Sequence, residues 1–404
     1  MSRKEFNNTK SEKKMRWYQF LFSLRNEGPE KVLIIFGIKI SVKRRIIQNI
    51  LHPLIFFQDL NSISAIRKSR NNILIIEPNM KYHAECLPSY VKYFNDLGYT
   101  PDLVLSRSNY NLNPFCRCNN LKMNIFPINE YNCMENIVSN KKIIKKYKKI
   151  MITTSIALNG VIVPELIKDK KQIIPIVHSI ATLDTCGVKY ATNGKCFLLS
   201  YFDNNNYPTI NPHYFGKIQN TSKNKKITRF ISVGRIQSDV KNYDILTDSV
   251  KRLLTAGYKD FEVVLVGWSG ELELEPELSK YIIQKGKLSF EDMFNELEKS
   301  DFYLSLLDYN NTKHLYYTND LATGSNQLVL AFKKPYLISE IYAKAYGYDN
   351  NSAIVYQKNA LSDAMIKAIN IKDDEYSNLQ HNIDILADNL YKLSLKNLRE
   401  ELND

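Results

Sequence analysis

Two cationic residues follow a short apolar segment in the second half of the chain, and together they could bind a phosphate. Residues 227–244 read ITRFISVGRIQSDVKNYD, in which the apolar run ends at Gly234 and is followed by Arg235 and Lys241. This order predicts a buried strand, a tight turn and a helix start. Unpaired N–H groups of a helix start, beside a guanidinium and an ammonium, suit a phosphate or diphosphate. The alternative is a strand end with solvated charges.

A second predicted helix start in the same half has the composition of an anion site. Gly324 and Ser325 follow Thr323 and precede an apolar stretch near Gln327. Glycine lets a ligand approach the backbone closely, and a serine hydroxyl can cap a helix or bind an anion. Two such junctions in one domain fit a diphosphate held between a cation pair and a helix N-terminus. Ser325 could equally be a plain N-cap.

Two histidines and a glutamate are the candidates for catalysis in the first half. His83 and Glu85 come shortly after an apolar run at Ile73–Ile76, and His178 directly follows another at Ile173–Val177. Ligands of open α/β sheets bind beyond the carboxyl ends of the strands, where these residues are expected. Each could act as a general base or bind a sugar hydroxyl. The alternatives are a capping glutamate and structural or exposed histidines.

Apolar runs alternate with helical patterns in two stretches, which predicts an α/β protein with two Rossmann-like domains facing each other across a cleft. The predicted strands are 73–76, 102–105, 150–154 and 173–177 in the first stretch, and 230–233, 262–266, 302–306 and 335–338 in the second. The predicted helices are 86–97 and 161–167, followed by 243–256, 277–285, 290–299, 326–332, 361–369 and 374–400. We expect the ligand site where the strand ends of both sheets meet.

The composition divides the chain into five predicted parts. They are an N-terminal extension (1–70), a first α/β domain (71–210), a linker (211–226), a second α/β domain (227–372) and a C-terminal helix (373–404). The linker prediction depends on a stretch rich in Asn, Pro and Lys from residue 203 onwards.

The net charge of +13 is concentrated at the N-terminus. Residues 1–70 contain 15 Lys or Arg and five Asp or Glu, whereas the remaining chain contains 40 and 37. This asymmetry argues against a nucleic-acid-binding protein with a basic body. The leader combines an aromatic segment, 15–24, with a predicted strand or hairpin at 31–42, and a helix is expected at 46–69. Aromatic residues beside cations predict contact with an anionic membrane surface, and packing on the main body is the alternative.

No apolar run approaches the roughly 18–20 residues that cross a bilayer, and no signal peptide is recognised, so a cytoplasmic protein is expected. Six cysteines are scattered, and Cys116 and Cys118 form CxC without a second pair at zinc-like spacing. We therefore expect reduced thiols and no metal site.

The second domain resembles the nucleotide-sugar-binding domain of GT-B glycosyltransferases, of the large retaining type that includes many lipopolysaccharide and capsule transferases. The resemblance is carried by VGRIQSDVKN (233–242), GKLSFEDMFNELEKSDFYLSLLD (286–308) and TGSNQLVLAFKKPYL (323–337). HAECLPSYVKYFNDLGY (83–99) and INPHYFGKI (210–218) are similar to segments of a bacterial subgroup.

The resemblance implies roles for individual residues. Arg235 and Lys241 would bind the donor diphosphate, and the turn at Gly286 and Lys287 would contact the nucleobase. Retaining members carry two glutamates with seven residues between them, and this chain lacks that pair. The first would fall near Asn319 or Asp320, and the second near Gln327 or Leu328. Gln327 could replace a ribose-binding glutamate, because its amide still hydrogen-bonds hydroxyls.

The implied activity is transfer of a sugar from a nucleotide-diphosphate sugar to a bacterial surface glycan or lipid-linked acceptor at the inner membrane face. The nucleotide sugar is the substrate, and neither a cofactor nor a metal is expected. Glu85 or His83 would be the base of an inverting reaction, whereas the donor phosphate itself could assist a retaining one. A nucleotide-sugar epimerase of the same fold and a catalytically inactive scaffold are the alternatives.

Overall fold

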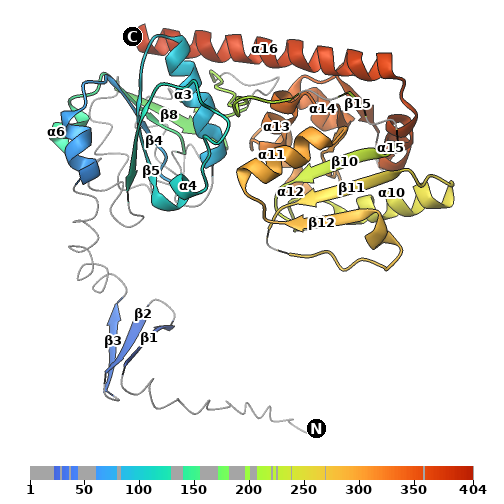
Figure 1. The fold of residues 1–404 in the computed structure, drawn as a ribbon, viewed down its shortest axis with the longest axis horizontal. Coiled ribbons are helices and arrows are strands. Elements are labelled where there is room, and N and C mark those ends of the chain that lie inside the picture. The colour runs from blue at the N-terminus through green and yellow to red at the C-terminus, as the bar shows by residue number, and fades with distance from the viewer. Residues whose placement is uncertain are drawn as a thin grey trace, which may run out of the picture. The chain divides into compact units, whose positions relative to one another are not determined.

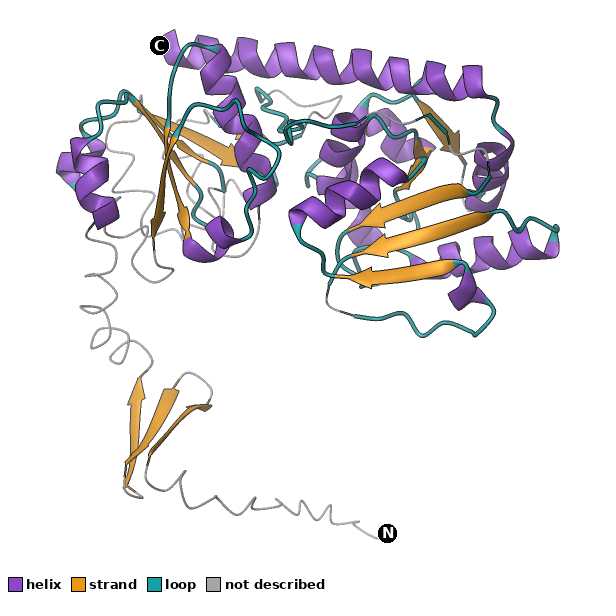
Figure 2. Cartoon of the chain, in the orientation of Figure 1, coloured by secondary structure: helices purple, strands orange, loops and turns teal. Residues whose placement is uncertain are grey.

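The structure is a computed structural model that falls into two units, Met1–Asn61 and Ser62–Asp404. It describes residues 22–27, 30–35, 38–43, 61–79, 83–128, 140–154, 172–181, 196–200, 207–219, 222–223, 226–237, 239–268, 270–357 and 360–403. Figures 1 and 2 show how the strands and helices are arranged within each unit. No described helix is long and apolar enough to cross a membrane.

The first unit contains a three-stranded antiparallel sheet, ordered β1-β2-β3. Its strands are β1 (Phe22–Glu27), β2 (Glu30–Ile35) and β3 (Ile38–Lys43). The pairing of Ile35 with Ile38 confirms the hairpin predicted at 31–42. The start of the aromatic segment and residues 44–60 lie outside the described residues, so membrane contact remains a prediction. Of the helix expected at 46–69, residues 61–68 are helical.

A parallel six-stranded sheet opens the second unit, with the order β6-β5-β4-β7-β8-β9. Its strands are β4 (Ile73–Ile76), β5 (Asp102–Ser106), β6 (Asn124–Ile128), β7 (Lys149–Ile152), β8 (Ile173–Val177) and β9 (Phe197–Leu198). The four predicted strands are confirmed, because runs buried on both faces leave a strong apolar signal. The sequence did not predict β6 or β9.

Short helices connect these strands. They are η1 (Ala84–Cys86), α3 (Leu87–Asp96), α4 (Arg107–Asn111) and α6 (Lys141–Ile144). Helix α3 ends before Gly98, whose φ of 84° suits the left-handed residue that follows a helix. The helix predicted at 161–167 lies outside the described residues.

A second parallel sheet of six strands has the order β12-β11-β10-β13-β14-β15. Its strands are β10 (Thr228–Val233), β11 (Phe261–Val266), β12 (Ile282–Gly286), β13 (Phe302–Leu304), β14 (Tyr336–Ser339) and β15 (Ala353–Tyr356). The prediction of a helix at 277–285 is wrong: a short turn, η3 (Leu278–Lys280), leads into β12. Ile282 and Ile283 pair with β11 instead, so sheet pairing overrides the local pattern.

Helices cover both faces of this second sheet, as Figure 2 shows. Its helices are α10 (Tyr243–Thr255), α11 (Phe290–Lys299), α12 (Thr312–Leu315), η4 (Tyr316–Thr318), α13 (Gly324–Phe332), α14 (Glu340–Tyr346) and α15 (Leu361–Asn370). Two separate cores result, because residues of α11, α13 and α14 share one cluster while residues of α10 and α15 share the other.

The long helix α16 (Asp373–Asn403) contributes to the cores of both sheets. Ile383 lies in a cluster with the second sheet, and Leu398 lies in the cluster of the first. The segment before β10 packs onto the same helix, since the N–H of Asn211 donates to the Ser394 hydroxyl at 3.0 Å. Phe215 in that segment is also buried. The second unit is therefore tied together by α16 and residues 207–219.

Candidate functional site

Arg235 stands at the carboxyl end of β10 and lies against an exposed tryptophan. Its guanidinium carbon is 5.1 Å from the centre of the Trp268 ring, and Trp268 remains 39% exposed. Two glycines make this contact possible: a Cβ at Gly267 would lie 1.7 Å from the carbonyl oxygen of Gly234. Gly234 also has a φ of 137°, which favours glycine. The turns after β10 and β11 therefore pack backbone to backbone and present a cation on an indole.

Lys241 is at the same turn, but its ammonium group is buried. Its Nζ donates to the Ser232 hydroxyl at 2.6 Å and to the Val233 carbonyl at 2.7 Å. Burial lowers the pKa of Lys241 to about 7. The solvated alternative is therefore wrong for Lys241, although Arg235 is exposed. An anion brought to this turn would stabilise the charged form of the amine.

The start of α13 is joined to this strand end through a buried phenol. The Tyr303 hydroxyl lies 3.0 Å from the Ser325 hydroxyl, 3.1 Å from the N–H of Val233 and 3.2 Å from the Val233 carbonyl. Ser325 is not the N-cap, because Thr323 has that role and accepts the N–H of Ser325 at 3.3 Å. The two elements predicted to bind a diphosphate are thus connected by hydrogen bonds.

Gly324 and Gly286, two further residues predicted to contact the donor nucleotide, have open space around them. A Cβ at Gly324 or at Gly286 would meet no atom within 4 Å. Gly286 ends β12 with a φ of 65°, and its carbonyl accepts the N–H of Gly267 at 2.9 Å. Lys287, which follows, is exposed. The Gly286–Lys287 turn therefore lies next to the turn that carries Trp268.

The two positions expected for a glutamate pair face the first sheet. The Asp320 carboxylate accepts hydrogen bonds from the Ser179 hydroxyl at 2.9 Å and the N–H of Ala181 at 2.6 Å. Gln327 is 2% exposed, and its Nε2 donates to the Ser200 hydroxyl at 3.1 Å. Its Oε1 is buried and has no hydrogen-bond partner among the described residues.

His83 and His178 come together at the carboxyl end of the first sheet. Their ring centroids lie 4.3 Å apart with an edge-to-face angle of 86°. The His178 Nε2 lies 3.1 Å from the Thr153 carbonyl, which only accepts, so Nε2 carries the proton. Burial lowers the pKa of His83 to about 4 and that of His178 to about 3. Both rings are therefore neutral near pH 7.

Two carboxyl groups lie at the same edge. Glu85 is half-buried at the start of η1, and burial raises its pKa. Glu77 is 1% exposed and accepts the hydroxyls of Thr153 at 2.7 Å and Thr154 at 3.1 Å. Burial raises the pKa of Glu77 to about 8, so this carboxyl is largely protonated at pH 7. The sequence gives Glu77 no role beyond its position directly after a strand.

The carboxyl ends of the two sheets meet through the backbone beside His178. Ser179 forms an antiparallel bridge with Leu321, and the N–H of Ala322 donates to the His178 carbonyl at 2.9 Å. The strand end that carries His178 therefore contacts the segment leading into α13. The predicted catalytic residues and the predicted donor residues lie on either side of this contact.

No protein-family model matches the chain, and no curated protein matches it by sequence. Solved structures do match. A glycosyltransferase from Rickettsia africae has a TM-score of 0.54 at 15% identity, over 82% of this chain and 98% of that one. Alr3699/HepE of Anabaena, solved in complex with UDP, has a TM-score of 0.54 at 13% identity, over 82% and 99%. The chain has the GT-B fold.

The two sheets of the GT-B fold differ in the charge that they place at their carboxyl ends. The second has the exposed Arg235 and Lys287, the buried Lys241 and the start of α13, and the first has His83, His178 and two carboxyl groups with raised pKa values. Among the described residues, no group of three or more His, Cys, Asp or Glu could hold a metal ion. The four described cysteines are free thiols.

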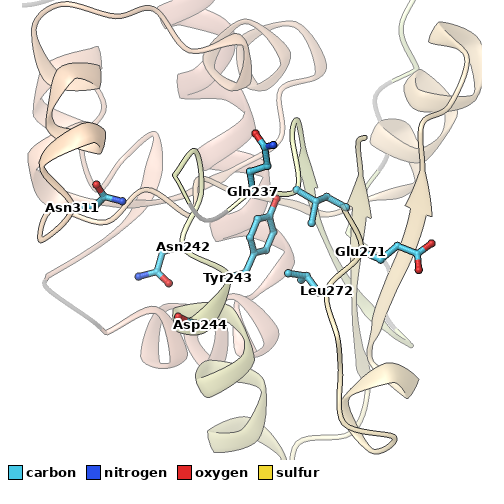
Figure 3. Close-up of a pocket in the computed structure, with 8 residues that line it drawn as sticks. Gln237, Asn242, Tyr243, Asp244, Glu271, Leu272 and Asn311 are labelled. Atoms are coloured by element: carbon cyan, nitrogen blue, oxygen red, sulfur yellow. The ribbon is translucent and has the colours of Figure 1, made fainter. Parts of the chain in front are cut away.

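A pocket of about 430 Å³ lies beside the loop that leads from Ile236 to the start of α10 in this GT-B chain (Figure 3). It is lined by Ile236, Gln237, Asn242, Tyr243, Asp244, Glu271, Leu272 and Asn311. Two of its lining residues are carboxylates, which disfavour an anion. This pocket therefore shares the loop before α10 with the predicted donor site but does not include Arg235 or Lys241.

Proposed function

We propose that this protein is a glycosyltransferase whose donor is a nucleotide-diphosphate sugar. One observation supports this proposal above all: two anion-binding elements, the turn with Arg235 and Lys241 and the start of α13, are joined through Tyr303 at one sheet edge. The UDP bound in the structure of Alr3699/HepE, which shares the fold, supports a nucleotide as ligand.

The second sheet would stabilise the leaving group. When the bond from the anomeric carbon to the phosphate oxygen breaks, the diphosphate gains negative charge. Arg235 and the positive end of the α13 helix dipole would stabilise that charge, and the N–H of Ser325 would exchange its bond to the Thr323 hydroxyl for one to the diphosphate. Lys241 would gain a proton as the anion approaches, because its pKa is lowered only by burial. Gly286 and Lys287 would contact the base, and the Oε1 of Gln327, which has no hydrogen-bond partner among the described residues, would accept a hydroxyl.

The first sheet would receive the acceptor. Glu85 is the proposed base of an inverting reaction, because its raised pKa brings it closer to the working pH of a general base. His83 is the second candidate, and a neutral His178 would accept a hydroxyl proton at Nδ1, since Nε2 is bound to Thr153. If the configuration is retained, the donor phosphate would take the acceptor proton instead.

We further propose that the acceptor is a bacterial surface glycan or a lipid-linked glycan, reached from the inner membrane face. The basic leader at 1–70 supports this proposal, because Lys and Arg are attracted to anionic lipid surfaces. The enzyme would then work at the cytoplasmic side. It would need no metal, because cationic side chains and helix N–H groups would stabilise the negative charge of the leaving group.

Binding and turnover of nucleotide sugars test the proposal, with Arg235→Ala beside wild type. We expect one nucleoside diphosphate to raise the melting temperature of wild type and not of the variant. Turnover only with an added glycan acceptor supports transfer, whereas epimerisation without an acceptor indicates the epimerase. Binding without any turnover indicates a scaffold, for which the missing glutamate pair is the supporting observation. If no nucleotide binds, the proposal is wrong.

A further inference from the structure

A long loop carries the start of α13. The chain leaves β13 at Leu304 and reaches α13 only at Gly324, with the short helices α12 and η4 between them. Leu306 within the loop has a φ of 54°, which is unfavourable for a leucine. A segment of this length without a long helix or strand depends on outside contacts for its conformation.

Buried tyrosines of α14 supply two of those contacts. The Tyr342 hydroxyl donates to the carbonyl oxygen of Asp308 at 3.1 Å. The Tyr346 hydroxyl, one helical turn later, donates to the carbonyl oxygen of Tyr317 at 2.6 Å. Both hydroxyls thus bind backbone oxygens of the loop, one near its start and one near its end.

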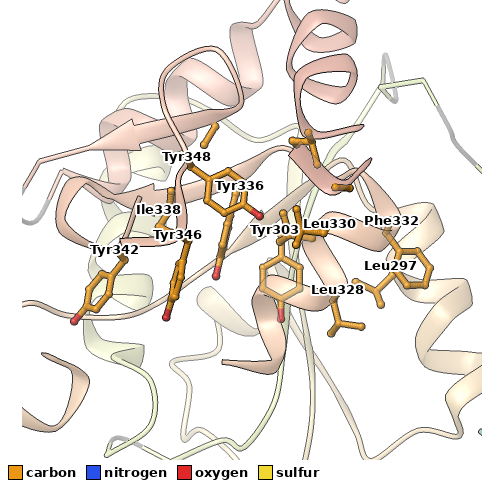
Figure 4. Packing of buried hydrophobic residues seen from close by; sticks show 14 of the residues in the cluster. Leu297, Tyr303, Leu328, Leu330, Phe332, Tyr336, Ile338, Tyr342, Tyr346 and Tyr348 are labelled. Carbon is orange, nitrogen blue, oxygen red and sulfur yellow. The ribbon is translucent and has the colours of Figure 1, made fainter. Parts of the chain in front are cut away.

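Two more buried tyrosines reach the first turn of α13. Tyr348 follows the end of α14, and its hydroxyl donates to the Asn326 Oδ1 at 2.7 Å. The Tyr303 hydroxyl lies 3.0 Å from that of Ser325. Figure 4 shows Tyr303, Tyr342, Tyr346 and Tyr348 in one hydrophobic cluster.

Packing alone does not account for these hydroxyls. The four tyrosines are at most 5% exposed, and phenylalanine would fill nearly the same space without bringing a polar atom into the core. What the hydroxyl adds in each case is a directed bond to the loop or to the helix start. Three of these tyrosines lie in the segment YAKAYGY (342–348). Tyr342 and Tyr346 are four residues apart, which places them on one face of α14.

We propose that Tyr303, Tyr342, Tyr346 and Tyr348 are positioning residues for the donor site, because they fix the loop that presents the N-terminus of α13. This inference rests on the proposed function and extends it to residues that never touch the nucleotide. A displacement of this helix start by even a fraction of an ångström weakens the hydrogen bonds that its N–H groups make to a diphosphate.

Tyr376 offers a matched control, because its hydrogen bond lies at the amino end of β13, the strand that carries Tyr303. Tyr376 is 1% exposed, and its hydroxyl donates to the carbonyl oxygen of Asp301 at 2.9 Å. Asp301 precedes β13 at its amino end, away from the carboxyl edge. Tyr376→Phe therefore loses the same kind of buried bond as Tyr348→Phe, but without a link to the loop.

The experiment measures two quantities in wild type, Tyr348→Phe and Tyr376→Phe. Calorimetry gives the Kd of UDP and of inorganic pyrophosphate, and amide hydrogen exchange gives the opening of residues 308–326. We expect Tyr348→Phe to weaken the binding of both probes about 3- to 10-fold and to speed exchange in that segment. Tyr376→Phe should leave both quantities within about twofold of wild type.

A second variant covers the case in which Tyr348→Phe does not fold. Asn326→Ala removes the acceptor instead of the donor and should weaken binding to a similar extent, and adding Tyr348→Phe to it should cost little more. Equal effects of Tyr348→Phe and Tyr376→Phe in a wild type that binds the probes would overturn the positioning role alone. If wild type binds neither probe nor any other nucleoside diphosphate, the proposed function is wrong, and the positioning role of the tyrosines at the donor site is wrong with it.

Discussion

The carboxyl edges of the two sheets are built from opposite chemistry. At the second sheet, the exposed Arg235 and the buried Lys241 stand beside the end of β10, and Tyr303 joins that strand end to the start of α13. At the first sheet, two neutral histidines and two carboxyl groups with raised pKa values follow β4 and β8. The same open-sheet geometry therefore carries cations at one edge and neutral, proton-accepting groups at the other, which is the difference on which the proposed donor and acceptor sites depend.

Burial acts on both edges, but its consequence differs. It moves Lys241 toward its neutral form, yet an arriving diphosphate can restore that charge. It keeps His83 and His178 neutral, because burial is the largest cause of the lowered pKa of each ring. The comparison teaches that the charge at the proposed donor edge would change when its ligand binds, whereas the histidines at the proposed acceptor edge are neutral before any ligand binds.

The largest effect is expected for Arg235→Ala. Loss of a charged hydrogen-bond donor to the diphosphate should weaken the binding of the matching nucleoside diphosphate about 10- to 100-fold. Titration calorimetry measures this change. Lys251→Ala is the control, because Lys251 is an exposed cation of α10 paired with Glu275. If both variants bind the nucleoside diphosphate equally well, Arg235 does not bind the diphosphate, and the proposed use of the cations at this edge is wrong.

Lys241→Met tests the buried cation in the ligand-free protein. The pKa of Lys241 is about 7 in the folded chain against an ordinary 10.5, so the unfolded chain binds more protons above pH 7. The free energy of unfolding of wild type should therefore rise from pH 7 to pH 9, by about 2 kcal/mol from this group.

Urea unfolding at pH 7, 8 and 9 measures this slope, which Lys241→Met should reduce. Lys334, whose pKa is also lowered to about 8, contributes the same slope to both proteins and cancels in the comparison. Parallel curves for wild type and variant would show that Lys241 is charged without a ligand.

The two histidines should make the acceptor edge sensitive to acid. Their pKa values in the folded chain, about 4 and 3, lie below the ordinary 6.5. The unfolded chain therefore binds more protons below pH 6.5, and the free energy of unfolding falls as the pH falls. Between pH 7 and pH 5 this loss should be about 1–2 kcal/mol for each ring. Glu77 titrates in the opposite direction, since its pKa is raised.

Variants separate these contributions. Replacing His83 and His178 by asparagine should remove their loss of unfolding free energy between pH 7 and pH 5 and leave the opposite contribution of Glu77, whereas His381→Asn, on the exposed face of α16, should leave the pH dependence unchanged. An unchanged acid sensitivity in the double variant would mean that these rings are not kept neutral by burial.

The smallest effect is expected for Trp268→Leu. The ring holds the Arg235 guanidinium at 5.1 Å, and a cation–π contact at an exposed site contributes about 0.5–1 kcal/mol. Nucleoside diphosphate affinity should therefore fall about two- to fivefold. Tyr110→Leu, which removes an exposed aromatic ring of α4 at the first sheet, is the control. A loss as large as that of Arg235→Ala would instead indicate that the indole stacks on the base itself.

The sequence was sufficient to predict the central strands of the sheets, but it predicted the edge strands poorly. Strands β4 and β8 are apolar throughout because both of their faces are buried. Strand β6 has a lower apolar content and contains Pro127, which an edge strand tolerates because one side needs no partner. Strand β12, also at an edge, has a helical pattern that only pairing with β11 overrides.

The sequence by itself determined which chemical groups stand at strand ends, because chain order and apolar runs place Arg235, Lys241, His178 and Ser325 there. Only the tertiary structure decided where those groups point and what charge they carry. The burial of Lys241, the contact of His83 with His178 and the turn of Asp320 toward Ser179 all join residues from different elements. Orientation and pKa depend on such distant neighbours, and a local pattern does not encode them.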